Sequence, residues 1–552
     1  MAERSFKKEV QQLRIGAGEE FRGEGILGIT KALLQSGVAY VAGYQGSPIS
    51  HLIDVLADAS DILEELGVHL ETSASEATAA ATLAASVMYP IRGAVAWKST
   101  VGTNVASDAL ANLASGGVTG GAVVIVGEDY GEGSSIMQER THAFAMKSQM
   151  WLLDPRPNLE SMVKSVEDCF ELSEASNTPV MMQVRVRGCH VHGRFIAKDN
   201  RRPAYTLKEA LESPRRDLGR IVLPPAAYEH EHEKIDKRWP AAVKFIKEHR
   251  LNEFFDGDMQ DVGLIVQGGV YNNAIRALQL LGLADHFGNS RVPLYVMNVV
   301  YPVIDDEVAN FCRGKKAVLM IEEGQPDYIE QNVNTVLRRA GVDTPLWGKN
   351  VLPLAGEYTT AVLRKGVEAF LRQWRPDALH AHPAVAADAQ AASQLEITEL
   401  SRPRLVEVPI TLHKRMEGLA KVVPQRPAGL CTGCPERPVF SALTLAQEKL
   451  GEHHISCDIG CHLFSILPPF NLGATTMGYG LGAASAAAFN IKGARRAISI
   501  MGDGGFWHNG LTSGIGNAVF NKYDGVIVII DNFYSSATGG QDILSSRARN
   551  AA

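Results

Sequence analysis

Residues Ile498–Asn532 read ISIMGDGGFWHNGLTSGIGNAVFNKYDGVIVIIDN. The apolar run Ile498–Met501 and the β-branched run Val526–Ile530 predict two strands, and the second has the continuous apolar pattern of a strand buried on both faces of a parallel sheet. Residues 507–521 between them predict a helix. A right-handed crossover of this length makes the two strands parallel, so both end at the same edge of the sheet. In open α/β sheets that edge binds ligands.

Oxygen-bearing side chains follow both strand ends. Asp503 lies in the turn Gly502-Asp503-Gly504, and Asn532 follows the second strand. A carboxylate and an amide oxygen at neighbouring strand ends suit Mg²⁺, which keeps few protein ligands and completes its octahedron with phosphate oxygens and water. The flanking glycines let a diphosphate approach the backbone closely. Taken alone, the pattern also fits an ordinary βαβ unit with a glycine turn.

The spacing of these residues adds a resemblance. Residues 505–531, 27 in number, separate Gly504 from Asn532. A GDG turn, a spacer of this size and an Asn together resemble the thiamine-diphosphate motif. The resemblance implies that Asp503, Asn532 and the backbone carbonyl of Tyr534 hold Mg²⁺ on the diphosphate.

The bulk composition is that of a globular protein with several domains. The chain has 552 residues, of which 45% are hydrophobic and 21% charged, and its net charge is −7. A length of this kind predicts about three or four domains. The charge gives no reason to expect nucleic acid, and no apolar stretch is long enough for a membrane span. Seven cysteines, an odd number, and an N-terminus without the apolar core of a signal peptide favour the cytoplasm.

The N-terminal region alternates helical and strand patterns from about residue 16 to residue 193, as a doubly wound domain does. Three stretches end in polar residues and match one family: GYQGSPIS (Gly43–Ser50), SASEATAAATLAAS (Ser73–Ser86) and AWKSTVGTNVASD (Ala96–Asp108). In this order they resemble segments of indolepyruvate:ferredoxin oxidoreductase large subunits, members of the thiamine-diphosphate-dependent 2-oxoacid:ferredoxin oxidoreductases. The resemblance covers nearly the whole chain.

Glu76 is the residue for which this resemblance matters most. A carboxyl near a helix start is commonly a member of a capping box. The resemblance instead implies the buried carboxyl that thiamine enzymes hydrogen-bond to the aminopyrimidine ring, where burial tunes its proton affinity. His508 matches a histidine that follows the family's turn, and its implied role is to donate to a substrate carboxylate or ketone oxygen. Capping the helix is the alternative role for His508.

The resemblance also implies the fold and the cofactor contacts. The expected fold class is α/β, with doubly wound pyrimidine-binding and pyrophosphate-binding domains and a transketolase C-terminal-like domain between them. The expected domains are a pyrimidine-binding domain (1–195), a helical connector (196–260), a transketolase C-terminal-like domain (261–375), a linker (376–426) and a pyrophosphate-binding domain (427–552). The implied cofactor-binding residues are Gly46, Ser47, Asn104, Cys431, Gly433, Cys434, Asp458, Gly460, Cys461, Gly502, Asp503, Gly504 and Asn532.

Two patterns in the last domain allow other interpretations. Cys431-x-x-Cys434 and Cys457-x₃-Cys461 are separated by 22 residues (435–456), and four thiols at such spacing suggest zinc or an iron–sulfur cluster. The resemblance implies instead that these turns cradle the cofactor without binding metal. The glycines of residues 478–483 imitate a dinucleotide fingerprint, but no clear strand precedes them, so we expect close helix packing rather than a nicotinamide site.

The favoured function is coenzyme-A-dependent oxidative decarboxylation of a 2-oxoacid, an arylpyruvate such as indolepyruvate, with ferredoxin as the electron acceptor. The run of cysteines that binds [4Fe–4S] clusters in ferredoxins is absent. We therefore expect the clusters in a C-terminal portion beyond these residues, since the last domain should need further strands, or in a smaller beta or gamma subunit. A homodimer or heterotetramer is expected.

Two other functions stay open at this point. One is a non-oxidative thiamine-diphosphate decarboxylase or carboligase, and the other is a metal-binding scaffold that uses the four cysteines. Three departures from the family pattern border the expected substrate space: Gln45 and Thr432 replace common prolines, and the turn reads GDG where relatives often have GDS. The identity of the 2-oxoacid therefore depends on residues that differ here.

Overall fold

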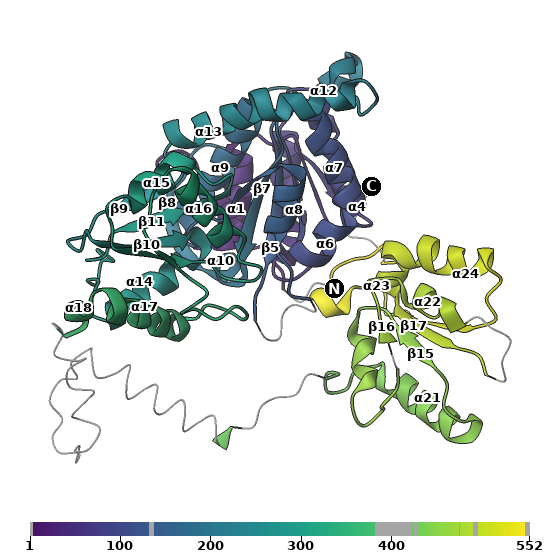
Figure 1. Ribbon diagram of the computed structural model, residues 1–552. Coiled ribbons are helices and arrows are strands. Elements are labelled where there is room, and N and C mark those ends of the chain that lie inside the picture. Colours follow the sequence, from purple (N-terminus) through teal and green to yellow (C-terminus); the bar gives the residue numbers. More distant parts are fainter. Residues whose placement is uncertain are drawn as a thin grey trace.

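The computed structural model describes residues 4–131, 137–380, 422–423, 429–473, 475–489 and 495–546. Three α/β units follow one another along the chain (Figure 1). The expected α/β class with doubly wound domains is confirmed. Most of the predicted linker, residues 376–426, lies outside the described residues, and so do residues 547–552 at the end of the last predicted domain.

The first unit is built on a seven-stranded sheet in the order β12-β6-β7-β5-β4-β2-β3. All neighbouring strands are parallel except β12, which runs antiparallel to β6. The strands are β2 (Tyr40–Gly43), β3 (His69–Thr72), β4 (Gly93–Lys98), β5 (Ala122–Glu128), β6 (Trp151–Leu153), β7 (Val180–Arg185) and β12 (Val299–Tyr301). A separate antiparallel ribbon pairs β1 (Glu20–Glu24) with β8 (His192–Ile196).

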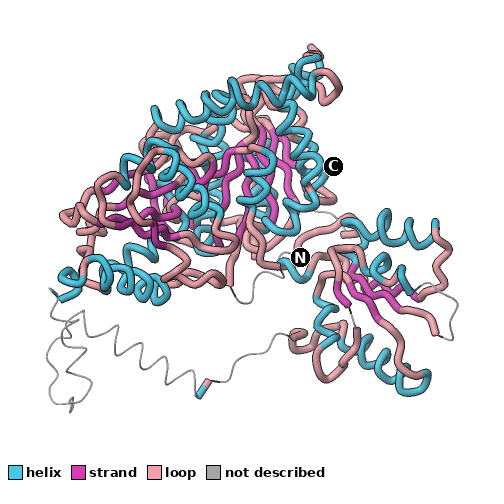
Figure 2. Tube along the Cα trace, viewed as in Figure 1, coloured by secondary structure: helices cyan, strands magenta, loops and turns pink. Residues whose placement is uncertain are grey.

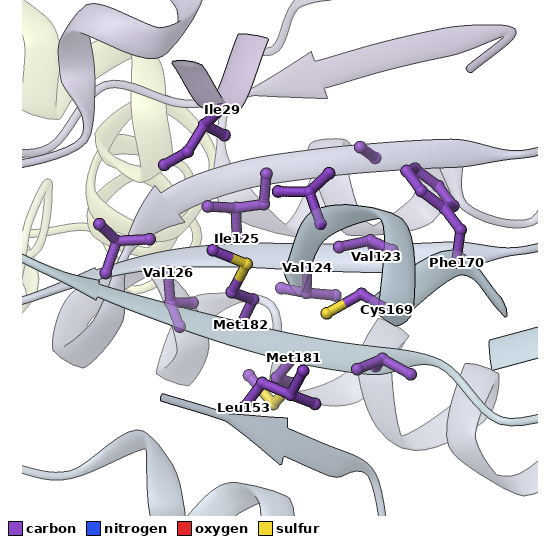
Figure 3. Close-up of a cluster of buried hydrophobic side chains, with 14 of the residues drawn as sticks. Ile29, Val123, Val124, Ile125, Val126, Leu153, Cys169, Phe170, Met181 and Met182 are labelled. Atoms are coloured by element: carbon purple, nitrogen blue, oxygen red, sulfur yellow. The ribbon is translucent and has the colours of Figure 1, made fainter. Parts of the chain in front are cut away.

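Helices cover both faces of this sheet, as Figures 1 and 2 show. One group consists of α1 (Gly25–Gln35), α2 (Ser50–Asp58) and α9 (Leu159–Ser176), which pack on one another. The other consists of α4 (Glu76–Thr82), α6 (Ser99–Val105), α7 (Ser107–Gly116) and α8 (Thr141–Ser148). Figure 3 shows Val123 of the sheet beside Phe170 of helix α9, and Ile125 beside Met182 of the neighbouring strand. These strands are apolar throughout because the sheet is buried on both faces.

The expected connector is helical over most of its length. It contains α11 (Leu207–Glu212), α12 (Ala226–Glu233) and α13 (Trp239–Glu248), and α13 packs on α9 of the first unit. Its end differs from the expected boundary at residue 260, because β9 (Glu253–Phe255) already pairs with β11 (Leu294–Met297) of the next sheet.

The second unit has a five-stranded sheet in the order β14-β13-β10-β11-β9. Its remaining strands are β10 (Val262–Gln267), β13 (Ala317–Ile321) and β14 (Leu346–Trp347), and its main helices are α14 (Tyr271–Leu280), α15 (Asp305–Cys312), α16 (Tyr328–Arg339) and α17 (Thr360–Trp374). The single strand expected at residues 293–300 is two strands. At Asn298 the chain leaves this sheet, and β12 joins the first unit, where the Asp154 N–H donates to the Asn298 carbonyl at 2.8 Å.

The third unit has a four-stranded parallel sheet in the order β16-β15-β17-β18. The strands are β15 (Ile455–Cys457), β16 (Thr475–Thr476), β17 (Ile498–Gly502) and β18 (Val526–Ile530), and the main helices are α21 (Arg437–Leu450), α22 (Gly482–Ser485), α23 (Asp503–Gly505), the π-helix η8 (Phe506–Gly516) and α24 (Asn517–Phe520). The crossover between β17 and β18 thus consists largely of a π-helix, a form found frequently at functional sites.

The prediction that Val526–Ile530 is buried on both faces is wrong for the described residues. Val526 is 43% exposed and Ile529 is 40% exposed. Among the described strands, β18 is the outermost of its sheet and pairs only with β17. An apolar pattern indicates the tendency of a strand to be covered, and the described residues leave β18 partly exposed. In the described part of the chain, no helix has the length and apolar character that crossing a membrane requires.

Candidate active site

A cleft of about 170 Å³ lies between the first and the third unit. It is formed where the strand ends of β2 and β4 face the strand ends of β17 and β18. Figure 1 shows the third unit meeting the first near α6 and α23. Ten of the residues predicted from the sequence line this cleft: Gly46, Ser47, Glu76, Gly460, Cys461, Gly502, Asp503, Gly504, Asn532 and Tyr534.

Asp503 organises the third unit's side of the cleft. Its carboxylate accepts three backbone N–H bonds, from Gly504 at 2.8 Å, Asn532 at 3.0 Å and Phe533 at 2.6 Å. These bonds tie the end of β17 to the end of β18, as the parallel arrangement predicts. Burial raises the pKa of Asp503, and the neighbouring Asp531 carboxyl raises it further through a hydrogen bond. Two adjacent carboxyl groups form a site that a cation would stabilise.

Asn532 and Tyr534 lie beside this carboxylate. The Tyr534 N–H donates to Asn532 Oδ1 at 3.4 Å, and Asn532 Nδ2 donates to Ser536 Oγ at 3.2 Å. Phe533 between them has a φ of 66°, which bends the chain sharply after the strand. A carboxylate, an amide oxygen and a backbone carbonyl in one turn are the hard oxygen donors that Mg²⁺ takes. The donor set therefore fits magnesium and a diphosphate.

Glu76 enters the cleft from the first unit. Glu76 is the first residue of α4 and is only 2% exposed. The capping box at this helix start is formed by Ser75 and Thr78, so Glu76 does not cap the helix. Its side chain packs against Gly102, where an added Cβ would lie 3.0 Å from Glu76 Cγ. The capping interpretation of Glu76 is therefore wrong, and the carboxylate faces the cleft.

His508 connects this carboxylate to the third unit. His508 Nε2 lies 2.5 Å from Glu76 Oε2, although 432 residues separate them, and both side chains are buried. The imidazole packs between the rings of Tyr44 and Tyr479, with centroids 4.9 Å and 4.8 Å away. Within the described residues, His508 Nδ1 is buried without a hydrogen-bond partner. A buried ring nitrogen without a partner calls for a ligand or another explanation, although His508 is not among the residues that line the cleft.

The two tyrosines are neutral phenols at neutral pH. Burial raises the pKa of Tyr479 to about 12 and raises that of Tyr44 well above its ordinary value. Tyr479 comes from the glycine-rich segment that imitates a dinucleotide fingerprint. In that segment Gly480 has a φ of 81°, and an added Cβ would lie 2.4 Å from the Gly505 carbonyl. The glycines thus serve close packing, as expected, although the two-residue strand β16 does precede them.

Lys98 is a cleft residue that the sequence analysis did not assign. Its ammonium donates to the Ser47 carbonyl at 2.7 Å and to Asp129 Oδ1 at 3.0 Å. Gly46 packs against it, since an added Cβ there would lie 2.5 Å from Lys98 Cβ. This lysine lies inside one of the matched segments, as the last residue of β4, and its position at a strand end was the signal that could have identified it.

Other predicted residues lie away from the cleft lining. Asn104 is exposed on α6 and donates to Glu139 at 2.9 Å. Asp458 is fully buried behind the cleft, where it accepts from the Gly480 N–H at 2.8 Å and contacts His462 Nε2 at 2.5 Å. Burial lowers the pKa of His462, but the Asp458 carboxylate outweighs burial and the net shift is upward. His462 itself lines the cleft. Asp458 therefore positions this histidine and the glycine segment.

The four cysteines of the last unit do not converge on one point. Cys431 is exposed, and Cys457 is buried in the small core of the third unit. Cys461 lines the cleft, whereas Cys431, Gly433 and Cys434 do not. No group of three or more His, Cys, Asp or Glu side chains in the described ranges could hold a metal ion. All seven cysteines are free thiols. This arrangement contradicts the four-thiol metal site.

Comparisons with known proteins agree with the cleft. Residues 458–552 match the family described as thiamine pyrophosphate enzyme, C-terminal TPP binding domain. The indolepyruvate oxidoreductase subunit IorA of Methanothermobacter thermautotrophicus is 30% identical over 520 residues, which cover 93% of this chain and 75% of that protein. The protein of the same name from Thermococcus kodakarensis is 27% identical over 530 residues, with 93% and 74% covered.

Among solved structures, a 2-oxoglutarate:ferredoxin oxidoreductase from Magnetococcus marinus has a TM-score of 0.49 and 16% identity, and the match covers 63% of this chain and 65% of that one.

Proposed function

The chain belongs to the family of indolepyruvate oxidoreductase IorA subunits, and from that premise we propose how its cleft holds thiamine diphosphate and which 2-oxoacid it uses. Its function is thiamine-diphosphate-dependent oxidative decarboxylation of a 2-oxoacid. One observation carries the site assignment: Glu76 of the first unit and Asp503 and Asn532 of the third unit line a single cleft.

Asp503, Asn532 and the carbonyl of Tyr534 would hold Mg²⁺ and, through it, the diphosphate. The donor chemistry supports this assignment, because magnesium needs few protein ligands when phosphate oxygens complete its shell. Gly502 and Gly504 leave room beside them, and an added Cβ at Gly504 would lie 2.3 Å from the Tyr479 hydroxyl. A side chain at that position would therefore narrow the passage for the diphosphate.

Glu76 would face the aminopyrimidine ring at the other end of the cleft. When bound, thiamine diphosphate supplies a carbon nucleophile for the substrate ketone and takes up the electron pair that carbon dioxide leaves behind. Glu76 Oε2 and His508 Nε2 lie 2.5 Å apart, within hydrogen-bond distance, so a proton could pass between them. The buried carboxyl can hold or release that proton at Oε2, which is the task of a general acid–base group. Tyr44 and Tyr479 keep the imidazole in place and exclude water.

The substrate end of the cleft contains a lysine, Lys98, that is paired with Asp129. Lys98 is mostly buried, and its ammonium lies beside the loop that contains Ser47. It would attract the carboxylate of a 2-oxoacid, and His508 Nδ1, when it carries the ring hydrogen, would donate to the ketone oxygen. We propose an arylpyruvate such as indolepyruvate as the substrate, because the relatives that match 93% of the chain are indolepyruvate oxidoreductase subunits.

We propose that coenzyme A receives the acyl group and that electrons pass through [4Fe–4S] clusters to ferredoxin. The clusters would be bound by a smaller beta or gamma subunit, in a homodimeric or heterotetrameric enzyme. Family membership favours this oxidative reaction over a non-oxidative decarboxylase or carboligase.

The test has a binding step and a chemical step. Calorimetry should show thiamine diphosphate binding only with Mg²⁺ present. The loaded protein should then reduce an artificial acceptor such as ferricyanide, anaerobically, when an arylpyruvate is added. Glu76→Ala should abolish the reduction, whereas Glu212→Ala, at an exposed site that pairs with Lys208, should not. Full activity of Glu76→Ala would remove this carboxyl from the mechanism, and release of aldehyde without acceptor reduction would favour the non-oxidative reaction.

A further inference from the structure

A second cavity, of about 740 Å³, adjoins the reaction cleft. It lies between α2, α3 (Ser60–Leu66) and the end of β3 on one side and residues 540–546 on the other. Tyr44, Gln45 and Gly504 line both spaces. These three residues therefore form the boundary through which a molecule in the reaction cleft would reach the second cavity.

The walls of this second cavity combine apolar side chains with polar and acidic ones. Its apolar side chains are Ile53, Ala57, Leu63, Val68, Leu70, Ala74, Trp507, Ile543 and Leu544. Asp54, Glu64 and Asp542 also line it, and Gln541 Nε2 donates to Asp54 Oδ2 at 3.2 Å. Of the described residues that line it, none is Lys, Arg or His. The cavity thus suits a large uncharged group and opposes a negative charge.

The reaction cleft next to it differs because cationic side chains, those of Lys98 and His462, line it beside the acidic Glu76, Glu436 and Asp503. A 2-oxoacid is also asymmetric, because its carboxylate and ketone are at one end and its side chain is at the other. Placing the charged end near Lys98 and the side chain in the second cavity satisfies both spaces. The reverse orientation would bring the carboxylate toward the three acidic residues.

Gln45 lies at the junction of the two spaces. It is 5% exposed, and its amide Nε2 has no hydrogen-bond partner within the described residues. A buried amide donor without a partner costs free energy unless a bound molecule accepts from it. The loop that contains it is held from behind, since the Gly46 N–H donates to Ser50 Oγ at 3.0 Å. The donor therefore has a fixed position.

We propose that the second cavity receives the uncharged aryl side chain of the 2-oxoacid and that Gln45 Nε2 donates to an oxygen of its reacting end. This inference rests on the proposed function, which it deepens by naming what selects the substrate. A dicarboxylic 2-oxoacid would place its second carboxylate among Asp54, Glu64 and Asp542. Repulsion by like charges in a partly buried space reduces affinity by about tenfold or more.

The first experiment measures binding without chemistry. Calorimetry on the full chain loaded with thiamine diphosphate and Mg²⁺ compares 3-(indol-3-yl)propionate with glutarate, neither of which has a ketone. The aryl acid should bind about tenfold more tightly or better. Equal affinity, or tighter binding of glutarate, would overturn the proposal. Failure of the protein to bind thiamine diphosphate would instead refute the proposed function, so the two failures are distinguishable.

Variants separate space, charge and hydrogen bonding. Ala57→Trp fills the second cavity and should abolish binding of the aryl acid, whereas Ala81→Trp on the exposed face of α4 should leave it unchanged. Glu64→Lys should raise the affinity for glutarate about tenfold, because it replaces one wall carboxylate by an ammonium. Glu212→Lys is the control for added charge elsewhere.

Gln45→Leu keeps the volume and removes the donor. It should raise KM for an arylpyruvate while the affinity for thiamine diphosphate stays within twofold of the parent. Unchanged KM would remove Gln45 from substrate binding. If Ala57→Trp also leaves aryl binding intact, the second cavity is not the side-chain site.

Discussion

The contact between Glu76 and His508 can be tested apart from catalysis. The two side chains are 3% and 1% exposed, and the Nε2–Oε2 distance is 2.5 Å. His508→Leu would leave the Glu76 carboxylate buried without this partner. Removing one member of a buried pair costs about 3–5 kcal/mol, whereas replacing both members by apolar groups of similar volume is often neutral or stabilising. His508→Leu should therefore destabilise the cleft more than the double variant Glu76→Leu/His508→Leu does.

Amide hydrogen exchange gives the local measurement that a chain of several domains requires, because such a chain has no single free energy of unfolding. Protection across residues 506–516 should fall on the order of a hundredfold or more in His508→Leu, since about 1.4 kcal/mol corresponds to a factor of ten. The double variant should recover most of it. His232→Leu, at an exposed position on α12, serves as the control. Parental protection in His508→Leu, or equal loss in single and double variants, would refute the contact.

Three further predictions address other parts of the molecule. Asp503→Asn should weaken magnesium-dependent binding of thiamine diphosphate at least about tenfold by calorimetry, because the amide cannot accept all three backbone N–H bonds that the carboxylate accepts. Burial lowers the pKa of His142 well below its ordinary value of 6.5. Below about pH 6.5 only the unfolded state gains this proton, so the free energy of local opening around His142 should fall by about 1.4 kcal/mol for each pH unit lost, and His142→Phe should reduce that slope in amide hydrogen exchange. Gly480→Ala should abolish cofactor binding, whereas Gly429→Ala, where an added Cβ meets nothing within 4 Å, should not.

The sequence pattern predicted the βαβ unit of β17 and β18 correctly because the residues that determine this unit lie close together in the sequence. The apolar runs at residues 498–501 and 526–530 do form adjacent parallel strands, β17 and β18. The prediction failed where distant residues decide the outcome. Strand β12 leaves the sheet of its sequence neighbour β11 because Asn298 is held by the Leu251 carbonyl and bonds to Asp154 of the first unit. No periodicity in residues 293–300 records that partner.

The candidate site likewise contains residues that local sequence predicts and residues that only the fold brings together. Asp503 and Asn532 are predictable because one crossover joins them. The contact of Glu76 with His508 spans 432 residues, and only the docking of two units creates it. Lys98 and Tyr479 lay inside segments that the sequence analysis quoted, yet their side chains could not be assigned to the cleft without knowing which way the strand ends point. For Cys431 and Cys434 the spacing indicated a shared turn but not its distance from the cleft.

Because the third unit has a small core, the cleft and the docking of the third unit on the first depend on each other. Its buried cluster contains only Phe440, Ile455, Cys457, Leu472 and Ile500 among the described residues, and β18 is half-exposed. Contacts with the first unit, such as those of His508 with Glu76 and Gln541 with Asp54, therefore contribute to its stability. A cofactor that touches both units binds only the docked arrangement, and ligands that bind one state stabilise it by mass action. Thiamine diphosphate with Mg²⁺ should then raise the protection of α4 and of residues 506–516 together, because both elements face the same bound molecule.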